Sequence, residues 1–165
     1  MMRYSPSRNA YVEAEDSVDV PDELYAALIG HAIEASPEGL PRLTSAQQRA
    51  DLLAAVTQKR WEVETGGIAI GGFSVKTGTS DQLRIDSVIG GMVANNYLSV
   101  PFKATSGWID LTLAQVQAVR SAVAEHVRLC FINERAHHEA IAALDASGID
   151  TYDINTGWPS AANNP

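Results

Sequence analysis

Residues 65–75 decide the fold, and they read Thr-Gly-Gly-Ile-Ala-Ile-Gly-Gly-Phe-Ser-Val. Two short runs of alternating apolar residues flank the second Gly-Gly pair, which is a strong sequence signal for a β-hairpin. We predict that four apolar residues share the buried face of this hairpin: Ile68, Ile70, Phe73 and Val75. The first Gly-Gly pair supplies residues that adopt the positive φ at which helices end.

A helix is predicted on the N-terminal side of this hairpin. Ser45-x-x-Gln48, or alternatively Thr44-x-x-Gln47, has the pattern of a capping box. From there to Thr65 no Gly or Pro interrupts the chain, and apolar residues recur at helical spacing. The helix is therefore predicted to run directly into the hairpin.

A second helix and a second hairpin follow on the C-terminal side. The cap pattern recurs at residues 79–82, and the apolar spacing predicts a helix to about Tyr97. The apolar runs 100–104 and 108–111 then flank Thr105-Ser106-Gly107, which predicts a hairpin closed by a bulge. Pro101 indicates that its strand lies at a sheet edge.

The last helix is predicted to be unusually long. Thr112-x-x-Gln115 caps it, and no Gly or Pro follows until Gly148, so it spans about 35 residues and roughly 50 Å. A domain of this size does not need such a helix. Its far end is predicted to project or to pack against a partner, which includes self-association with a second copy.

These signals predict an α+β fold: a helix, a hairpin, a helix, a hairpin and a long helix. The two hairpins are predicted to form one small antiparallel sheet of about four strands, because a lone hairpin is marginal. The Pro-punctuated residues 1–43 predict a small N-terminal β/α segment with a linker at 36–41. Residues 44–147 then form the helix and hairpin domain, and residues 148–165 an extended C-terminal tail.

The composition predicts an acidic globular protein. The chain has 12 Lys+Arg against 20 Asp+Glu and a formal net charge of -8, with no basic run longer than Lys59-Arg60. This charge argues against nucleic-acid partners and anionic membranes, which attract basic proteins. The N-terminus lacks the apolar region of a signal peptide, so cytoplasmic synthesis is predicted. The single cysteine, Cys130, is predicted to be a buried small hydrophobe.

The best candidates for chemistry lie on the long helix. His126, Glu134 and His138 suit a metal site by residue type, but the His-Glu-x-x-His spacing is absent. The alternative, which we favour, is a solvated helix face with ion pairs. No nucleophile, base and oxyanion hole occur together, so neither a metal, a cofactor nor an enzymatic activity is predicted. Trp61, Phe102 and Trp108 are expected in the core or on a half-buried sheet surface.

The N-terminal segment carries the residues predicted to bind a partner. They are Tyr4, Pro6, Tyr11, Pro21, Leu24, Tyr25 and Leu28. Few long apolar residues surround them, which favours exposure until a partner covers them. The alternative is that they form a small self-contained core, and the sequence does not decide between the two.

Two resemblances to known families are carried by these residues. The stretches 59–68, Phe102-Lys103 with 107–111, and 126–131 resemble the domain of unknown function DUF4376 of tailed-phage and prophage proteins, over roughly residues 48–145. The stretch Tyr4-Ser5-Pro6-Ser7-Arg8-Asn9-Ala10-Tyr11, with Val20-Pro21-Asp22, resembles the opening of phage tail-fibre assembly proteins. Gly39-Leu40-Pro41 departs from the Gly-Tyr-Pro of those proteins.

The resemblances imply a tail-fibre assembly chaperone that assists the folding and trimerisation of a phage fibre or receptor-binding protein. Such a chaperone acts in the host-cell cytoplasm during assembly, and in some phages it remains on the virion tail. The alternative is a structural virion component, such as a baseplate or fibre-tip subunit. The expected partner is a trimeric fibre protein, with no nucleic acid and no membrane.

Overall fold

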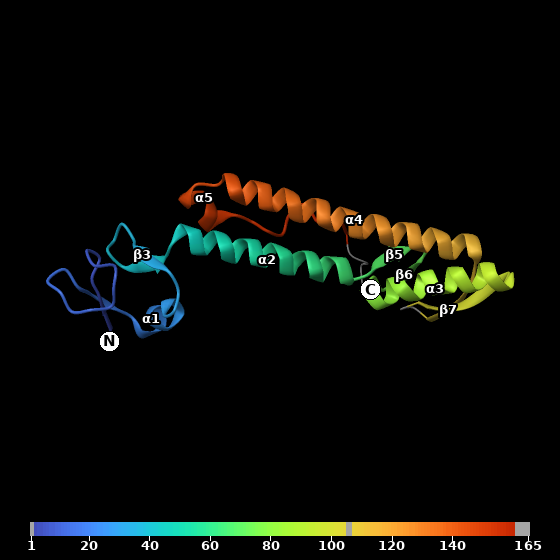
Figure 1. Ribbon diagram of the computed structural model, residues 1–165, viewed down its shortest axis with the longest axis horizontal. Helices are drawn as coiled ribbons and strands as arrows, with labels where there is room; N and C mark the ends of the chain where they lie inside the picture. Colours follow the sequence, from blue (N-terminus) through green and yellow to red (C-terminus); the bar gives the residue numbers. More distant parts are fainter. Residues whose placement is uncertain (1, 105–106, 161–165) are drawn as a thin grey trace. The chain divides into compact units, whose positions relative to one another are not determined.

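The computed structural model describes residues 2–104 and 107–160. Figure 1 shows the order of the elements: β1 (Met2–Tyr4), β2 (Val18–Val20), α1 (Asp22–Leu28), β3 (Ile33–Ala35), β4 (Pro41–Leu43), α2 (Ser45–Thr65), β5 (Ile68–Ile70), β6 (Phe73–Val75), α3 (Thr79–Asn95), β7 (Ser99–Ala104), β8 (Gly107–Thr112), α4 (Leu113–Ala143) and α5 (Ala146–Thr151). The predicted α+β class, with its order of helices and hairpins, is confirmed.

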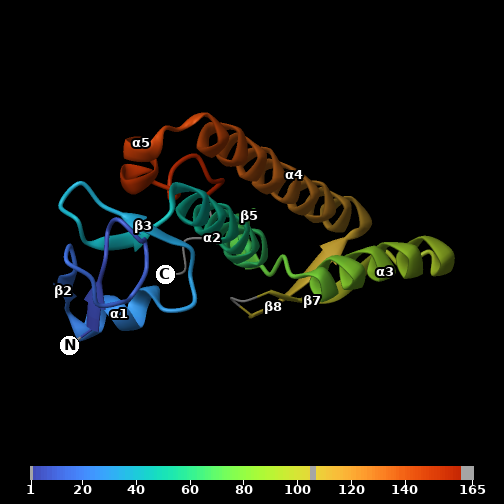
Figure 2. The same cartoon turned by 60° about the vertical axis from the view of Figure 1, so that its left-hand side comes forward.

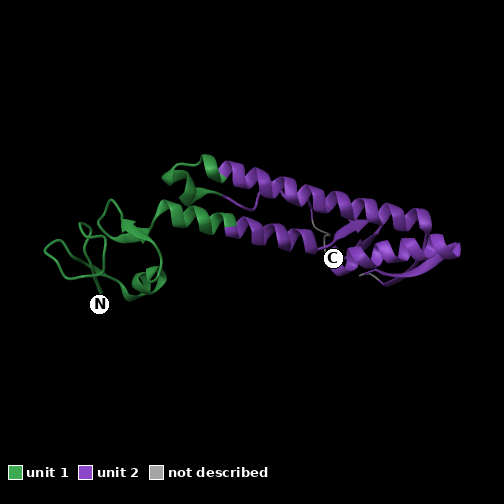
Figure 3. Ribbon diagram, viewed as in Figure 1, with its two compact units in different colours: residues 1–53, 141–152 green, residues 54–140, 153–165 purple. Residues whose placement is uncertain are grey.

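The chain divides into two compact units, which Figure 3 colours separately. The first comprises residues 1–53 and 141–152, and the second comprises residues 54–140 and 153–165. Helices α2 and α4 each contribute one end to the first unit and the remainder to the second. The first unit is therefore assembled from two distant stretches of sequence.

Two hairpins and α1 form the N-terminal part of the first unit. β1 pairs with β2 and β3 pairs with β4, both antiparallel. The segment predicted as a linker at 36–41 is instead the turn of the β3–β4 hairpin and the first residue of β4. The backbone N–H of Ser36 donates to the carbonyl of Leu40 at 2.7 Å, and this bond closes the turn. Turn residues and linker residues have the same composition, so the sequence did not separate them.

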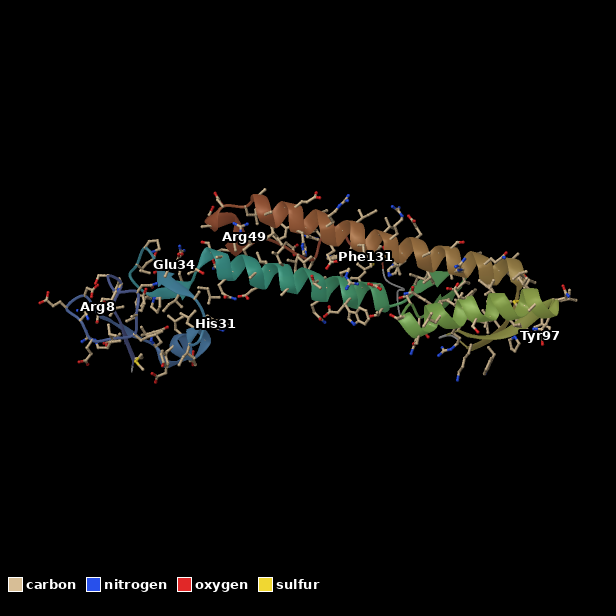
Figure 4. The ribbon with its side chains drawn as sticks, in the orientation of Figure 1. Arg8, His31, Glu34, Arg49, Tyr97 and Phe131 are labelled. Carbon is tan, nitrogen blue, oxygen red and sulfur yellow. The ribbon has the colours of Figure 1, made fainter. Side chains whose placement is uncertain are left out.

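The first unit also contains the start of α2, the end of α4 and α5. Arg49, which Figure 4 labels on α2, donates to the carbonyls of Ile141 and, at 3.0 Å, Leu144. These carbonyls lie at the end of α4, where a helix leaves its last C=O groups without internal partners. Gln48 donates to Asp150 of α5 at 2.8 Å. Side chains of α2 thus hold the C-terminal stretch of the unit.

The predicted extended tail is corrected in part. The long helix α4 ends at Ala143, and a separate short helix, α5, begins at Ala146. Asp145 caps α5, because its side chain accepts a hydrogen bond from the N–H of Gly148 at 2.8 Å. Beyond α5, in the second unit, Trp158 Nε1 donates to the carbonyl of Ile154 at 2.7 Å, and its ring stacks on His137 at 5.2 Å. The tail is docked as far as Trp158, and residues 161–165 lie outside the described residues.

The second unit is built around the β5–β6 hairpin. β5 and β6 pair with Ile68 opposite Val75, and Gly71 and Gly72 form the turn, both with positive φ. Gly67 has a φ of +94°, and a Cβ there would lie 2.8 Å from the carbonyl oxygen of Val75. The predicted helix stop and the predicted buried face of the hairpin are both confirmed. Ile68 and Val75 belong to a core with α3, β8 and α4: Ile85, Met92, Leu111, Val116, Val119 and Val123.

The expected four-stranded sheet is wrong. β5–β6 and β7–β8 are separate two-stranded ladders, each stabilised by packing on helices. Figures 1 and 2 both show β7 and β8 alongside α3. In β7–β8, Ala104 pairs with Gly107, so Gly107 belongs to the strand and not to the connection. The predicted bulge depends on residues 105–106, which lie outside the described residues. Pro101 lies on an edge strand, as predicted.

Two of the three predicted caps are confirmed. Thr112 and Gln115 form a reciprocal capping box, with Gln115 Oε1 accepting from the N–H of Thr112 at 2.9 Å. At α2 the alternative Thr44-x-x-Gln47 is the one present, since Thr44 Oγ1 accepts from the N–H of Gln47. At α3 the prediction is wrong: Gly78 occupies the N-cap position without a side-chain hydrogen bond.

Candidate protein-binding surfaces

The seven N-terminal residues predicted to bind a partner differ in their exposure to solvent. Tyr4 and Leu28 are buried, Pro6, Tyr11, Leu24 and Tyr25 are half-buried, and Pro21 is exposed. The expectation that the set stays exposed until a partner covers it is therefore wrong for Tyr4 and Leu28. The role of these seven residues in partner binding stays a prediction.

The N-terminal aromatic cluster comprises Tyr4, Tyr11 and Tyr25. The ring centroids of Tyr4 and Tyr11 are 5.7 Å apart, and those of Tyr11 and Tyr25 are 4.8 Å apart at an interplanar angle of 90°. Such edge-to-face pairs each stabilise by about 0.5–1.5 kcal/mol beyond area burial. Burial raises the pKa of both Tyr4 and Tyr11 above the usual value. These contacts agree with the alternative prediction, in which the N-terminal residues pack into a small core of their own.

The Tyr-Ser-Pro-Ser stretch is held by a polar network around Asp16. Ser5 Oγ donates to Asp16 Oδ1 at 2.6 Å, and the backbone N–H of Ser7 donates to Asp16 Oδ2 at 2.8 Å. These hydrogen bonds to the ionised carboxylate lower the pKa of Asp16 to about 2. Asn9, with a φ of +49°, accepts from the Tyr4 hydroxyl and donates to the carbonyl of Ile33 at 2.6 Å. The motif therefore fixes the shape of the loop between β1 and β2.

A groove of about 750 Å³ opens in the second unit between α3, β7 and the end of β6. We call it the β7 groove. Its lining is Val75, Lys76, Ser80, Asp81, Arg84, Ile85, Val88, Pro101, Phe102, Lys103, Ala104 and Trp108. Four consecutive residues of β7, 101–104, belong to this lining. Successive side chains of a strand point to opposite faces, so an unbroken run of lining residues means that the groove follows the strand edge.

The rim of the β7 groove is basic and aromatic. Lys76, Arg84 and Lys103 contribute three positive charges and Asp81 one negative charge, a local balance of 3 - 1 = +2 in a chain whose net charge is -8. Lys103 Nζ lies 5.6 Å from the ring centroid of Trp108, a cation–π distance. Trp108 is 69% exposed, so its expected place in a core or on a half-buried surface is wrong.

Further exposed apolar side chains lie on α3 and just beyond its end. Leu83 and Val93 are exposed on the helix, and Leu98 is 89% exposed in the following turn. Tyr97, labelled in Figure 4 beyond the end of α3, is also exposed. With Trp108 on β8, these are five exposed large apolar side chains of the second unit.

Of the helix residues considered as metal ligands, His126 and Glu134 make structural contacts, whereas Nε2 of His138 is buried without a hydrogen-bond partner in the described part of the chain. Arg60 forms ion pairs with Glu64 and with Glu134, whose Oε2 lies 3.0 Å from Arg60 Nε. Arg60 also lies 4.6 Å from the ring centroid of Phe131, which Figure 4 labels on α4. His126 Nε2 donates to the carbonyl of Val63 at 2.9 Å. Among residues 2–104 and 107–160, no three His, Cys, Asp or Glu side chains form a metal-binding group.

Cys130, Trp61 and Phe102 of the second unit are each predicted from the sequence to be buried or half-buried. Cys130 is buried, as predicted, and burial raises the pKa of its thiol, which makes it a poor nucleophile. Trp61 is 47% exposed, so the expectation of a core or half-buried position is wrong. Phe102 is half-buried against the core, as expected.

The model of the family described as "Domain of unknown function (DUF4376)" matches residues 47–156. The chain belongs to the DUF4376 family. The match runs from the first turn of α2, through both hairpins and α4, to the docked residues after α5, so the β7 groove lies within the DUF4376 domain. The N-terminal aromatic cluster lies outside it. No curated protein and no solved structure shows significant similarity to the chain. No helix in the described residues is long and apolar enough to cross a membrane.

Sequence reasoning missed the β7 groove. Its lining comes from four separate elements, β6, α3, β7 and β8, and no local pattern brings Lys76, Arg84 and Lys103 together. One sequence signal was available, because Pro101 indicates that β7 is an edge strand. Trp108 lies on the adjacent strand β8, opposite Lys103. An edge strand with an aromatic beside it is a typical place for a binding surface.

Proposed function

We propose that this protein is a tail-fibre assembly chaperone that binds a phage fibre or receptor-binding protein and assists its folding and trimerisation. It acts in the cytoplasm of the host cell during assembly and can remain on the fibre in the virion tail. The proposal requires binding only and assigns no reaction to the chain.

The observation that carries the proposal is the β7 groove. A chaperone for a fibre must cover apolar surface and unpaired strand edges until the trimer forms, because such surfaces aggregate when left open. The groove offers an apolar floor with Val75, Ile85 and Phe102, together with an exposed tryptophan at its rim. Tryptophan and arginine are enriched among residues that dominate binding energy.

The N-terminal segment gives the proposal its specific partner. Its Tyr-Ser-Pro-Ser stretch resembles tail-fibre assembly proteins, and the polar network around Asp16 holds that stretch in one conformation. The half-buried Pro6, Tyr11 and Tyr25 leave part of this segment available for contact. A second contact with the fibre through this segment is consistent with the proposal.

Co-expression tests the proposed function. The fibre encoded by the same phage is produced with and without this chain, and soluble trimer is measured by size-exclusion chromatography. We expect a several-fold increase in trimer with the chain present and co-purification of the two. Equal yield in both cultures, with no complex, would refute the chaperone. If the chain then occurs at fixed stoichiometry in purified particles, the structural virion role replaces it.

A further inference from the structure

The edge of β7 that faces the groove carries no paired strand. Among the described residues β7 pairs with β8 alone. Proline is tolerated in a ladder where its missing N–H points away from the paired strand, so Pro101 and, two residues on, Lys103 direct their backbone groups toward the groove. An unpaired edge of this kind is a template for a strand from another chain.

The groove selects for the charge of that strand. Lys76 at the end of β6, Arg84 on α3 and Lys103 on β7 surround it, and Asp81 is the one acid in the lining, paired with Arg84 at 3.1 Å. That pair is largely exposed on the arginine side, so it contributes little and can rearrange. A locally positive groove attracts an acidic segment and disfavours a basic one.

The groove also limits the length of the strand. β7 has six residues, and Pro101 removes one N–H donor from the edge. Val75, Ile85, Val88 and Phe102 form an apolar floor, so alternate residues of the incoming strand meet apolar side chains. The other alternate residues meet the basic rim. The complementary sequence is a short run that alternates acidic and β-branched residues.

We propose that the β7 groove binds a short, extended segment of the fibre in which acidic and apolar residues alternate, and that this segment pairs with β7 as an added strand. This inference rests on the proposed function for the identity of the partner. The strand pairing itself is tested without a fibre, so the two can fail separately.

The direct test uses defined hexapeptides. The acetylated, amidated peptides EVEVEV and KVKVKV are titrated into the ¹⁵N-labelled full chain and followed by NMR. We expect EVEVEV to shift the amides of β7 and of the first half of α3, with an affinity on the order of tenfold or more above KVKVKV. Equal affinity of the two peptides, or shifts confined to other elements, would overturn the proposal.

A backbone-blocked peptide tests the strand pairing. Two methylated forms of EVEVEV are compared, one N-methylated at the valines and one at the glutamates, because the N–H groups of alternate residues point to opposite edges of a strand. Each form loses three hydrogen-bond donors without a change of charge. We expect one of the two forms to bind several-fold more weakly than the other. Unchanged affinity of both forms would mean that side chains alone hold the segment and would overturn the added strand. Hexathymidylate binding more tightly than EVEVEV would overturn the assignment to a protein segment.

Charge reversal tests the rim with a matched control. K76E/K103E changes the total charge by 2 × (-2) = -4 and reverses two charges at the groove. R128E/R135E makes the same change at exposed arginines on α4. We expect the first variant to lose tenfold or more in EVEVEV affinity and the second to lose little. Equal losses in two folded variants would mean that only total charge matters, against the proposal.

The same variants separate the inference from the proposed function. If K76E/K103E still promotes fibre trimerisation as well as the wild type, the groove is not the fibre site, and the chaperone function stands without it. If the wild type has no effect on the fibre but EVEVEV binds the groove, the function fails and the strand-binding site remains.

Discussion

At the scale of single residues, the Tyr-Ser-Pro-Ser stretch shows how a sequence motif is held in shape. Ser5 is fully buried and donates to Asp16, while Tyr4 donates to Asn9. Each polar group of the stretch that leaves water has a charged or polar partner, as buried polar groups require. Asp16 is the residue on which this network depends.

The pH dependence of the first unit follows from Asp16. Its pKa in the folded chain is about 2, below its ordinary value of 3.8. A carboxylate with a lowered pKa stabilises the fold above the unfolded value, and this stabilisation is lost as the pH falls through the folded value. The protection of the β1 and β2 amides against hydrogen exchange, relative to the intrinsic exchange rate at each pH, should therefore fall as the pH is lowered from about 4 toward 2. Asp16→Asn should destabilise these strands at pH 7, and it should weaken the dependence of their amide protection on pH.

The matched control for this prediction is Glu15→Gln, which neutralises the neighbouring exposed acid. It should leave both the stability and the pH profile of β1 and β2 unchanged. A profile for Asp16→Asn as steep as that of the wild type would assign the acid sensitivity to other carboxylates.

At the scale of elements, Thr77 joins the end of α2 to the end of β6. Its Oγ1 accepts from the N–H of Gly67 at 3.0 Å and donates to the carbonyl of Glu64, and its side chain is fully buried. Thr77→Val keeps the size of the side chain, but it leaves the N–H of Gly67 and the carbonyl of Glu64 without the hydroxyl that bonds to them. The free energy of unfolding should fall by about 1–3 kcal/mol, measured by urea denaturation.

Thr79→Val is the control, because Thr79 is exposed in the first turn of α3. It makes the same chemical change without stranding a buried group and should shift the unfolding free energy by less than about 0.5 kcal/mol. A similar loss of unfolding free energy in both variants would show that the hydroxyl of Thr77 does not stabilise the fold through its two hydrogen bonds.

The elements were largely predictable and their assembly was not. Residues 65–75 gave the hairpin because Gly-Gly turns and alternating residues are local signals, and the Thr112–Gln115 box located the start of α4 for the same reason. The single sheet was wrong because the two hairpins form separate ladders that share a core with α3 and α4, which is a tertiary choice. The β7 groove depends on that choice, so no local pattern revealed it.

At the scale of the whole molecule, charge distribution links the fold to the proposed function. A net charge of -8 keeps the chain soluble and repels acidic surfaces, whereas the β7 groove is locally positive. Attraction to an acidic segment through this groove is screened by salt, with a Debye length of about 8 Å at physiological ionic strength. The affinity for the fibre should therefore fall as the salt concentration rises.

Hydrogen–deuterium exchange of the chain, alone and in complex with its fibre, tests the central claim most directly. We predict that the fibre slows exchange in β7 and the first half of α3, because an added strand protects the open edge and covers the groove. Slowing also in residues 4–28 would support the second contact through the N-terminal segment. An unchanged exchange rate in β7, with a fibre bound, would contradict the claim that the chain binds its partner through the β7 groove.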